Sequence, residues 1–352
     1  MKLGEISEID YGTRIVKKSE EGTIYPVYGG GGETFRANSF NREDCFVISR
    51  FGMSPECIRF IKGEFFLNDS GMTLNTKQKN MLKIEYLNYY LFLNQERVYL
   101  CGRGVAQKNI DIEAFNSLQI PLPPINIQEK IVAEIEVLEK KEEKAKKEAE
   151  GLREGIEELF KKEIFNKFSK IKIGELAETS SGGTPLRSNF QYYENPTIPW
   201  LTSSEVRQGN IYKSESFISE LGLKESSAKL FPINSVLLAM YGATAGQVGI
   251  LRFEASTNQA ICGILPNERY LPEFMFYHLK FQYEDLLKAR TGVARDNLSQ
   301  DKIKEFEIFI PPIEEQREIV SKIEKLEEKI NQLEKGISLI PSLKEAVLEK
   351  YL

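Results

Sequence analysis

The sequence is poor in the residues that most often carry catalysis or bind metals. Its 352 residues include one histidine, His278, and four cysteines, Cys45, Cys57, Cys101 and Cys262. One histidine excludes metal sites built on paired histidines and argues against a Ser–His or Cys–His nucleophile. No two cysteines form a C-x-x-C pair. We therefore expect buried, reduced thiols, no structural zinc, and a packed rather than catalytic His278.

Long apolar runs are also missing. The nearest candidate for a membrane span, residues 236–251, contains Gly242, Gly246 and Gly249, a pattern typical of sheet and turn. The N-terminus has acidic residues and no apolar signal core. These observations predict a cytoplasmic protein.

An excess of positive charge is absent. The chain has 47 basic and 52 acidic residues, and residues 1–120 carry 15 of each sign. This balance argues against binding nucleic acid by bulk attraction to phosphate. A DNA-binding protein of this composition needs local basic patches or a basic partner.

Motifs of nucleotide and methyl-transfer chemistry are missing too. There is no G-K-[ST] phosphate loop, and the four glycines at 29–32 lack G-x-G-x-x-G spacing, so we expect a flexible recognition loop there. Asn195-Pro196-Thr197 lacks the aromatic residue that amino-methyltransferases place after Asn-Pro-Pro, which indicates a turn. The sequence predicts no catalytic residue, no metal and no cofactor in this chain.

What the sequence does contain is an internal repeat. Residues 123–141 and 311–329 share 11 of 19 aligned positions at an offset of 188. The same offset relates Gly-Val-Ala-Gln-Lys-Asn at 104–109 to Gly-Val-Ala-Arg-Asp-Asn at 292–297. A duplication of this kind determines the architecture.

Each repeated segment is predicted to be a long helix. Two prolines precede it, and apolar residues then recur with a period of 3.5 among Lys and Glu, the a/d pattern of a coiled coil. We expect the first helix to run from about Gln128 to Phe165. Gly151 and Gly155 allow either local slack or the close approach of another helix, and Pro341 should kink or end the second helix.

The predicted fold class is α+β. Two mixed α/β domains, residues 1–120 and 171–308, are joined by two long antiparallel coiled-coil helices, within residues 121–170 and 309–352, with pseudo-two-fold symmetry. Heptads alone are equally compatible with a generic coiled coil. The duplicated proline entry and the duplicated G-V-A-x-x-N motif favour a more specific device, a rod that holds two unlike reading domains.

The second globule carries short motifs in a fixed order, and these support a resemblance. They are Ser-Gly-Gly-Thr-Pro at 181–185, Ile-Pro-Trp at 198–200, Ile-Ser-Glu-Leu-Gly-Leu at 218–223, Ala-Lys-Leu-Phe-Pro at 228–232, Tyr-Gly-Ala-Thr-Ala-Gly at 241–246 and Asn-Gln-Ala at 258–260. Together with the P-P-I-x-x-Q-x-x-I-V helix entry, this order resembles the specificity subunits of type I restriction–modification systems. The first globule departs from the pattern, since Gly12-Thr13 lacks the following proline, and it resembles a divergent target-recognition domain.

The resemblance implies a division of labour. Each target-recognition domain would read one half of a bipartite double-stranded DNA target, and the helices would set the spacer and dock two methylase subunits. The methylase would use S-adenosylmethionine to methylate adenine, and motor–nuclease subunits would use ATP and Mg²⁺.

Candidate DNA-binding residues follow from the groups that contact base edges and phosphates, on exposed elements or at glycine-rich turns. They are Tyr28, Arg36, Arg50, Arg103 and Lys108 in the first globule, and Thr184, Arg187, Ser203, Ser204, Tyr241, Thr244 and Arg295 in the second. The alternative for each is a fold-defining turn or a solvated charge. The glycine, proline and Asn-Gln motifs themselves are expected to shape the fold.

Apolar residues outside the a/d stripe are candidates for docking a methylase. Val132, Val137, Phe160 and Val320 are predicted to be exposed for this purpose, with core packing as the competing interpretation. The alternative function for the chain is a coiled-coil scaffold whose globules bind protein or carbohydrate.

Overall fold

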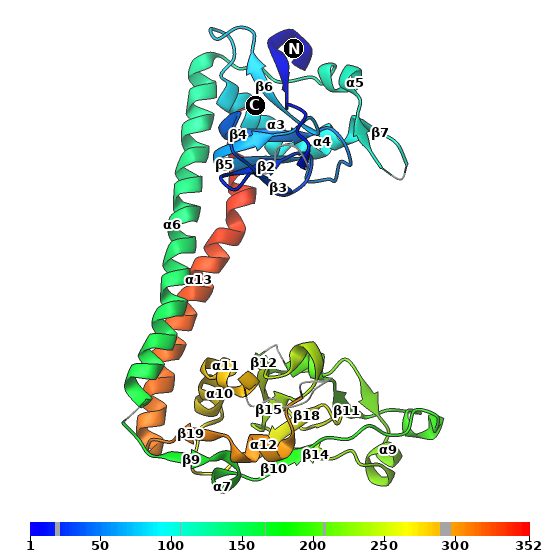
Figure 1. Ribbon diagram of the computed structural model, residues 1–352, viewed down its shortest axis with the longest axis vertical. Helices are drawn as coiled ribbons and strands as arrows, with labels where there is room; N and C mark the ends of the chain where they lie inside the picture. Colours follow the sequence, from blue (N-terminus) through cyan, green and yellow to red (C-terminus); the bar gives the residue numbers. More distant parts are fainter. Residues whose placement is uncertain (18–21, 106, 166, 207–208, 289–296) are drawn as a thin grey trace. The chain divides into compact units, whose positions relative to one another are not determined.

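Two long α-helices form where the sequence repeats. The computed structural model describes residues 1–17, 22–105, 107–165, 167–206, 209–288 and 297–352. In it α6 runs over Ile125–Ile164 and α13 over Ile313–Tyr351 (Figure 1). The a/d residues predicted from the sequence are all buried or half-buried on these helices. The first helix therefore begins three residues before the predicted Gln128 and ends one residue before Phe165.

The chain divides into two compact units, and each contains parts of both helices. The first unit is Met1–Lys147 with Leu333–Leu352, and the second is Glu148–Gln332. Ion pairs join the two helices within each unit, and a residue further along α6 pairs with a residue earlier in α13. The two helices are therefore antiparallel. The cross-helix ion pairs include Glu134–Lys350 at 2.8 Å and Glu139–Lys344 at 3.0 Å in the first unit, and Glu148–Lys329 at 2.7 Å and Glu163–Lys322 at 3.9 Å in the second. The predicted domain limits at 120, 170 and 308 stay a prediction.

The glycines and the proline of the long helices bear on alternatives that the sequence left open. A Cβ built on Gly151 or Gly155 meets no described atom within 4 Å, so no other part of the described chain packs closely there. Pro341 lies inside α13, which continues to Tyr351. Of the two predicted effects of Pro341, an end of the helix is wrong and a kink stays a prediction. Packing of the residues that follow, including buried Lys344, Val347 and Leu348, outweighs the lost backbone hydrogen bond.

The first unit is built on a mixed sheet. Its six described strands have the order β1-β6-β4-β5-β2-β3, in which the β2–β5 pairing is parallel and the others are antiparallel. The strands are β1 Ser7–Tyr11, β2 Tyr25–Tyr28, β3 Phe35–Ala37, β4 Arg42–Ser49, β5 Ile58–Leu67 and β6 Gly71–Thr76. The short helices are α1 Leu3–Ile6, α3 Ile84–Leu93, α4 Gln95–Leu100 and α5 Ile112–Asn116, and a hairpin joins β7 Gly102–Arg103 to β8 Asn109–Ile110.

One apolar core joins this sheet to the long helices. Buried Phe46 and Met72 of the sheet and Leu87 of α3 belong to the same cluster as Ile131 of α6 and Val347 of α13. The domain and the helix pair therefore share their hydrophobic stabilisation in the first unit.

The second unit has two principal sheets. The five-stranded one, counted over the described residues, has the order β10-β18-β15-β16-β12, and the four-stranded one has the order β13-β11-β17-β14. The strands are β10 Thr179–Ser181, β11 Ile198–Leu201, β12 Gly209–Ile211, β13 Phe217–Ile218, β14 Leu230–Phe231, β15 Val236–Ala239, β16 Val248–Leu251, β17 Ala255–Thr257 and β18 Ile261–Ile264. β9 Lys170–Lys172 pairs with β19 Glu307–Phe309.

The apolar stretch at 236–251 is sheet and turn, as predicted, because it forms β15, the 3-10 turn η2 Gly242–Thr244 and β16. The remaining helical segments of the unit are α7 Ile173–Leu176, η1 Phe190–Tyr192, α8 Ser203–Val206, α9 Glu220–Glu225, α10 Pro272–Phe281, α11 Tyr283–Lys288 and α12 Gln300–Glu305. None of the described helices has the length and apolar character needed to cross a membrane.

The predicted fold class is confirmed: two mixed α/β domains are attached to two long antiparallel helices.

Substituting Phe160 of α6 tests the packing of the second unit, because its fully buried ring lies against Phe274, His278 and Phe281. Phe160→Ala should lower the free energy of unfolding by about 3–5 kcal/mol through cavity formation. Val137→Ala, at a half-exposed site on the same helix, should change it by less than about 1 kcal/mol. Urea unfolding followed by circular dichroism measures both, and equal losses would contradict this packing.

Candidate nucleic-acid interface and helix groove

Three of the predicted DNA-binding residues lie on neighbouring segments of the first unit. The loop after β4 packs beside the β7–β8 hairpin through hydrogen bonds from Ile110 N–H to the Arg50 carbonyl and from Met53 N–H to the Lys108 carbonyl, both 2.8 Å. Arg50 and Lys108 therefore lie on adjacent segments, and Arg103 lies on the paired strand of the same hairpin. We call Arg50, Arg103, Val105, Gln107 and Lys108 the hairpin surface.

Arg50 is held in place by neighbours of the first unit. One of its guanidinium N–H groups donates to the Asp69 carbonyl at 2.7 Å, and the guanidinium lies 4.3 Å from the Tyr11 ring centroid and 4.9 Å from that of Phe51. These contacts orient a half-buried positive charge without an acidic partner among the described hydrogen bonds and ion pairs. Arg50 thus fixes the loop, and its charge has no acidic partner among the described residues.

Arg103 and Lys108 differ in how their charges are balanced. Arg103 has a side chain that is 79% exposed and pairs with Asp111, whose carboxylate also caps α5. Lys108 is half-buried, with its ammonium 4.0 Å from the Tyr99 ring centroid. Each side chain therefore has one partner within the first unit, Asp111 for Arg103 and the Tyr99 ring for Lys108.

The hairpin also carries an apolar residue that sequence reasoning missed. Val105 is fully exposed beyond β7, although valine is usually buried. The signal was present in the repeat, since Val105 and Val293 occupy equivalent places in the two G-V-A-x-x-N motifs. Val293 and the predicted contact Arg295 lie outside the described residues.

Tyr28 and Arg36 have structural partners. The Tyr28 ring packs edge-on against Phe65 at 5.7 Å, and Arg36 forms an ion pair with Glu33 at 3.2 Å and donates to the Ile24 carbonyl at 2.9 Å. Tyr28 is half-buried in this packing, whereas Arg36 remains exposed.

The glycine loop at 29–32 is anchored by side chains that the sequence did not single out. Arg59 donates to the Gly29 carbonyl at 2.6 Å and Ser49 Oγ donates to the Gly30 carbonyl at 2.7 Å. The first half of the loop is therefore held at two carbonyls, and its predicted flexibility stays a prediction. A Cβ on Gly31 or Gly32 would meet nothing within 4 Å, so the second half is open to solvent.

In the second unit the short motifs shape the fold, as expected. Trp200 Nε1 donates to the Gly183 carbonyl at 3.0 Å, and a Cβ on Gly183 would lie 2.3 Å from the Ser227 backbone. Only glycine permits this approach, so the Ser-Gly-Gly-Thr-Pro motif is a packing element. Gly246, with φ of +88°, makes the turn after η2.

The candidate contacts of the second unit are spread over several turns. Thr184 donates to Gln259, Ser204 shares a hydrogen bond with Thr202 at 2.8 Å, and Ser203 begins α8. Thr244 donates to the Tyr241 carbonyl within the η2 turn, where Tyr241 is 38% exposed. Arg187 is exposed and has no hydrogen-bond or ion-pair partner within the part of the chain that the structure describes.

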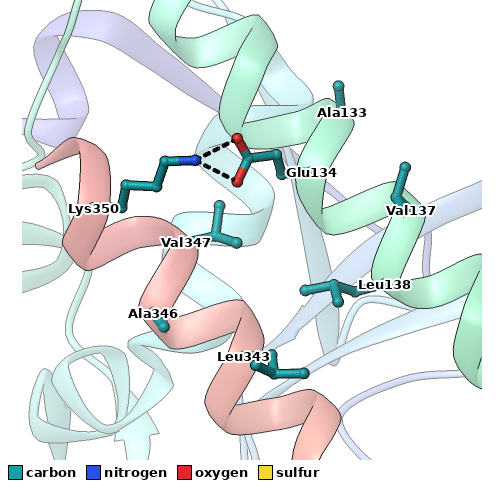
Figure 2. Close-up of a pocket in the computed structure, with 8 residues that line it drawn as sticks. All are labelled: Ala133, Glu134, Val137, Leu138, Leu343, Ala346, Val347 and Lys350. Carbon is teal, nitrogen blue, oxygen red and sulfur yellow. Dashed lines mark hydrogen bonds and ion pairs between the residues drawn. The ribbon is translucent and has the colours of Figure 1, made fainter.

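A groove lies between α6 and α13 in the first unit, and Figure 2 shows its lining. Its volume is about 530 Å³, and it is lined by Ala133, Glu134, Val137, Leu138, Leu343, Ala346, Val347 and Lys350. The floor is apolar, and Val137 and Leu343 remain 50% and 46% exposed. Lys350 donates to both carboxylate oxygens of Glu134 at 2.8 and 3.1 Å, and this contact holds the pKa of Glu134 below its usual range.

The predicted docking residues do not share one surface. Val137 faces the groove (Figure 2), and Val132 is half-buried against the core of the first unit. The expectation that Phe160 and Val320 are exposed was wrong, because Phe160 is 0% and Val320 6% exposed. Phe160 lies on a second buried face of the helix, beside the coiled-coil seam, where the neighbouring domain covers it.

Comparison with known proteins identifies the family. A model described as the type I restriction modification DNA specificity domain matches residues 1–151 and 166–339. The chain belongs to this family. The specificity subunit of the Escherichia coli type I restriction enzyme EcoR124I/EcoR124II is 24% identical, over 100% of this chain and 92% of that protein.

Solved structures agree in fold with this specificity-domain protein. The S subunit of a type I restriction-modification system from M. genitalium has a TM-score of 0.61 at 19% identity, over 100% of this chain and 95% of that one. The HsdS subunit from Thermoanaerobacter tengcongensis has a TM-score of 0.52 at 17% identity, with the same coverage. The resemblance inferred from the motif order is confirmed, and it extends to the divergent first domain.

The single histidine of this specificity-domain protein is a packing residue, as predicted. His278 is 0% exposed, and its Nε2 accepts the Phe309 N–H at 2.9 Å. Burial lowers the pKa of His278 to about 4. The cysteines are free thiols; Cys57, Cys101 and Cys262 are buried and Cys45 is half-buried.

The depressed pKa of His278 makes stability depend on pH. Below its ordinary value of about 6.5 the unfolded imidazole binds a proton, whereas the folded one stays neutral down to about pH 4. Stability should therefore fall as the pH drops through this window. Between pH 7 and pH 5 the wild type should lose about 2 kcal/mol more than His278→Phe, measured by urea unfolding. Identical pH profiles for the two proteins would refute a buried neutral His278.

Proposed function

We propose that this chain is the DNA-reading subunit of a type I restriction–modification complex. Each domain reads one half of a bipartite double-stranded target, and the helices set the spacer. The observation that carries the proposal is the match of the specificity-domain family to both halves of a chain whose helices are duplicated. If the family model matched one domain only, it would support one target-recognition domain, which reads a single site without a spacer.

The hairpin surface is the DNA contact that the geometry favours in the first domain. Arg50, Arg103 and Lys108 bring three cations to the hairpin and the loop packed beside it, and the hairpin also exposes Val105. Apolar side chains flanked by cations are used to enter DNA grooves. Because the chain has a net charge of −5, such a patch supplies direction more than bulk affinity.

The helices supply the surface for the methylase. The groove of the first unit offers an apolar floor, with exposed Val137 and Leu343, bounded by a charged pair, which suits an amphipathic helix. Two methylase subunits and the motor–nuclease subunits would complete the complex. The methylase then supplies most of the phosphate contacts.

The catalytic steps belong to those partner subunits in this proposal. We propose that this chain has no catalytic residue and binds no cofactor, that the methylase subunits bind S-adenosylmethionine, and that the motor–nuclease subunits use ATP and Mg²⁺. The sequence supports this assignment by lacking phosphate-loop and methyltransferase motifs. The complex would act on double-stranded DNA in the cytoplasm.

Removing two positive charges from the hairpin tests the DNA contact. In the assembled complex with methylase, the double variant Arg103→Gln/Lys108→Gln should bind target DNA more weakly, and the slope of log affinity against log salt should fall by about one for each lost phosphate contact. Val105→Ser should weaken binding without changing that slope. Lys62→Gln, which removes an exposed charge from β5, is the matched control. Gel shifts at several salt concentrations measure all four proteins.

The same experiment decides between the candidate functions. If the assembled wild-type complex shows no sequence-selective DNA binding, the coiled-coil scaffold for protein or carbohydrate replaces the proposal. If it binds selectively but the hairpin variants match Lys62→Gln, the DNA contact lies elsewhere in the domain.

A charge in the groove tests methylase docking. Val137→Asp should weaken association with the methylase at least tenfold, because a carboxylate would be desolvated on an apolar floor. Ser342→Asp adds the same charge to an exposed position of α13 outside the groove lining and should have little effect. Titration of labelled chain with purified methylase measures both, and equal affinities would exclude the groove as the docking site.

A further inference from the structure

Gln128 of α6 is a buried polar residue whose amide has a full set of backbone partners. It is 0% exposed. Its Oε1 accepts the Lys83 N–H at 2.9 Å, and its Nε2 donates to the carbonyls of Met81 and Pro123, both at 2.8 Å. Since Lys83 is the N-cap residue of α3, this amide joins the first turns of the long helix to the start of a helix of the domain.

Gln316 of α13 makes the same contacts in the second unit. It is also 0% exposed; its Oε1 accepts the Leu271 N–H at 2.8 Å, and its Nε2 donates to the Arg269 carbonyl at 3.0 Å and the Pro311 carbonyl at 2.9 Å. Each partner lies 188 residues after its counterpart. The partner side chains differ between the units, Lys against Leu and Met against Arg, but the contacts use backbone atoms. This attachment therefore tolerates divergence of the domain sequences.

A second contact of each long helix is duplicated in the same way. Tyr89 of α3 donates to Glu139 of α6 at 2.8 Å, and Tyr277 of α10 donates to Glu327 of α13 at 2.7 Å. Burial, with the adjacent carboxylate, raises the pKa of both tyrosines, so each hydroxyl keeps its proton. Each glutamate follows its glutamine by eleven residues, which is about 16 Å and three turns along the same helix face.

Two attachment points at this separation fix a domain in position and in direction. A single contact would allow the domain to pivot, and an apolar interface alone is non-directional. The glutamine at the helix entry and the tyrosine three turns further on together resist rotation about any axis across the helix. We call Gln128 with Tyr89–Glu139, and Gln316 with Tyr277–Glu327, the two latches.

We propose that the two latches are positioning elements that make spacer measurement accurate to one base pair. The inference rests on the proposed function. One base pair moves a half-site by about 3.4 Å and rotates it by about 35°. A domain free to tilt on its helix would accept both changes, whereas a latched domain rejects them.

The test is a genome methylation map from hosts that carry the intact system with each variant. Gln128→Met and Gln316→Met remove the amide with little change of volume, and Tyr89→Phe and Tyr277→Phe remove one hydroxyl each. Gln332→Met is the matched control, since Gln332 is exposed on α13. Val47→Ala, in a separate buried cluster of the first unit, controls for lost stability.

The expected result is relaxed spacing. Latch variants should methylate sites whose spacer is one base pair longer or shorter, with discrimination against them reduced roughly tenfold. The two controls should keep the wild-type spacer, with Val47→Ala lowering only the methylated fraction.

Each other outcome is decisive. Strict spacing in the glutamine variants, with fewer methylated sites as in Val47→Ala, overturns the latch proposal. If the glutamine variants fail to assemble, strict spacing in both tyrosine variants overturns it. A wild-type map without any bipartite motif contradicts the proposed function instead, so the two failures are distinguishable.

Discussion

A buried amide that must satisfy all its hydrogen bonds is the constraint on which this structure depends. Gln128 and Gln316 sit where each domain meets its long helix, and their partners are backbone groups that only one placement of the domain supplies. Leaving those groups unpaired in a buried site is costly, and unlike apolar contacts they require a defined direction. The directional contact therefore sets the placement, and the hydrophobic core stabilises it.

Charge compensation is the second theme of the molecule. Arg36 pairs with Glu33 and Arg103 with Asp111, and Lys–Glu ion pairs join the long helices. Exposed pairs of this kind add little stability, but they cancel the long-range field that would attract any nucleic acid. A reading subunit built in this way discriminates locally and relies on a partner for affinity.

The repeat predicted more than the composition did. The offset of 188 in residues 123–141 and 311–329 anticipated both long helices, and the same offset relates the latch residues and their backbone partners. The a/d stripe also predicted a seam between the helices, because a period of 3.5 leaves one apolar face per helix. The antiparallel direction was predicted from the order of globules and helices along the chain. Even the divergent first domain was recognised through its place in the repeat rather than through its own motifs.

The sequence by itself determined the duplication, the helical segments, the family and the absence of motifs for catalysis. Only the tertiary structure decided which side chains remain free. Phe160 and Val320 looked like surface residues beside the seam, yet the second unit buries them, and Val105 looked ordinary, yet it is fully exposed. Arg50 and Lys108 are 58 positions apart in the chain and are brought together by two backbone hydrogen bonds. Helical periodicity shows which face of one long helix packs against the other. The exposure of a side chain and its clustering with others depend on contacts between distant segments, which no local pattern encodes.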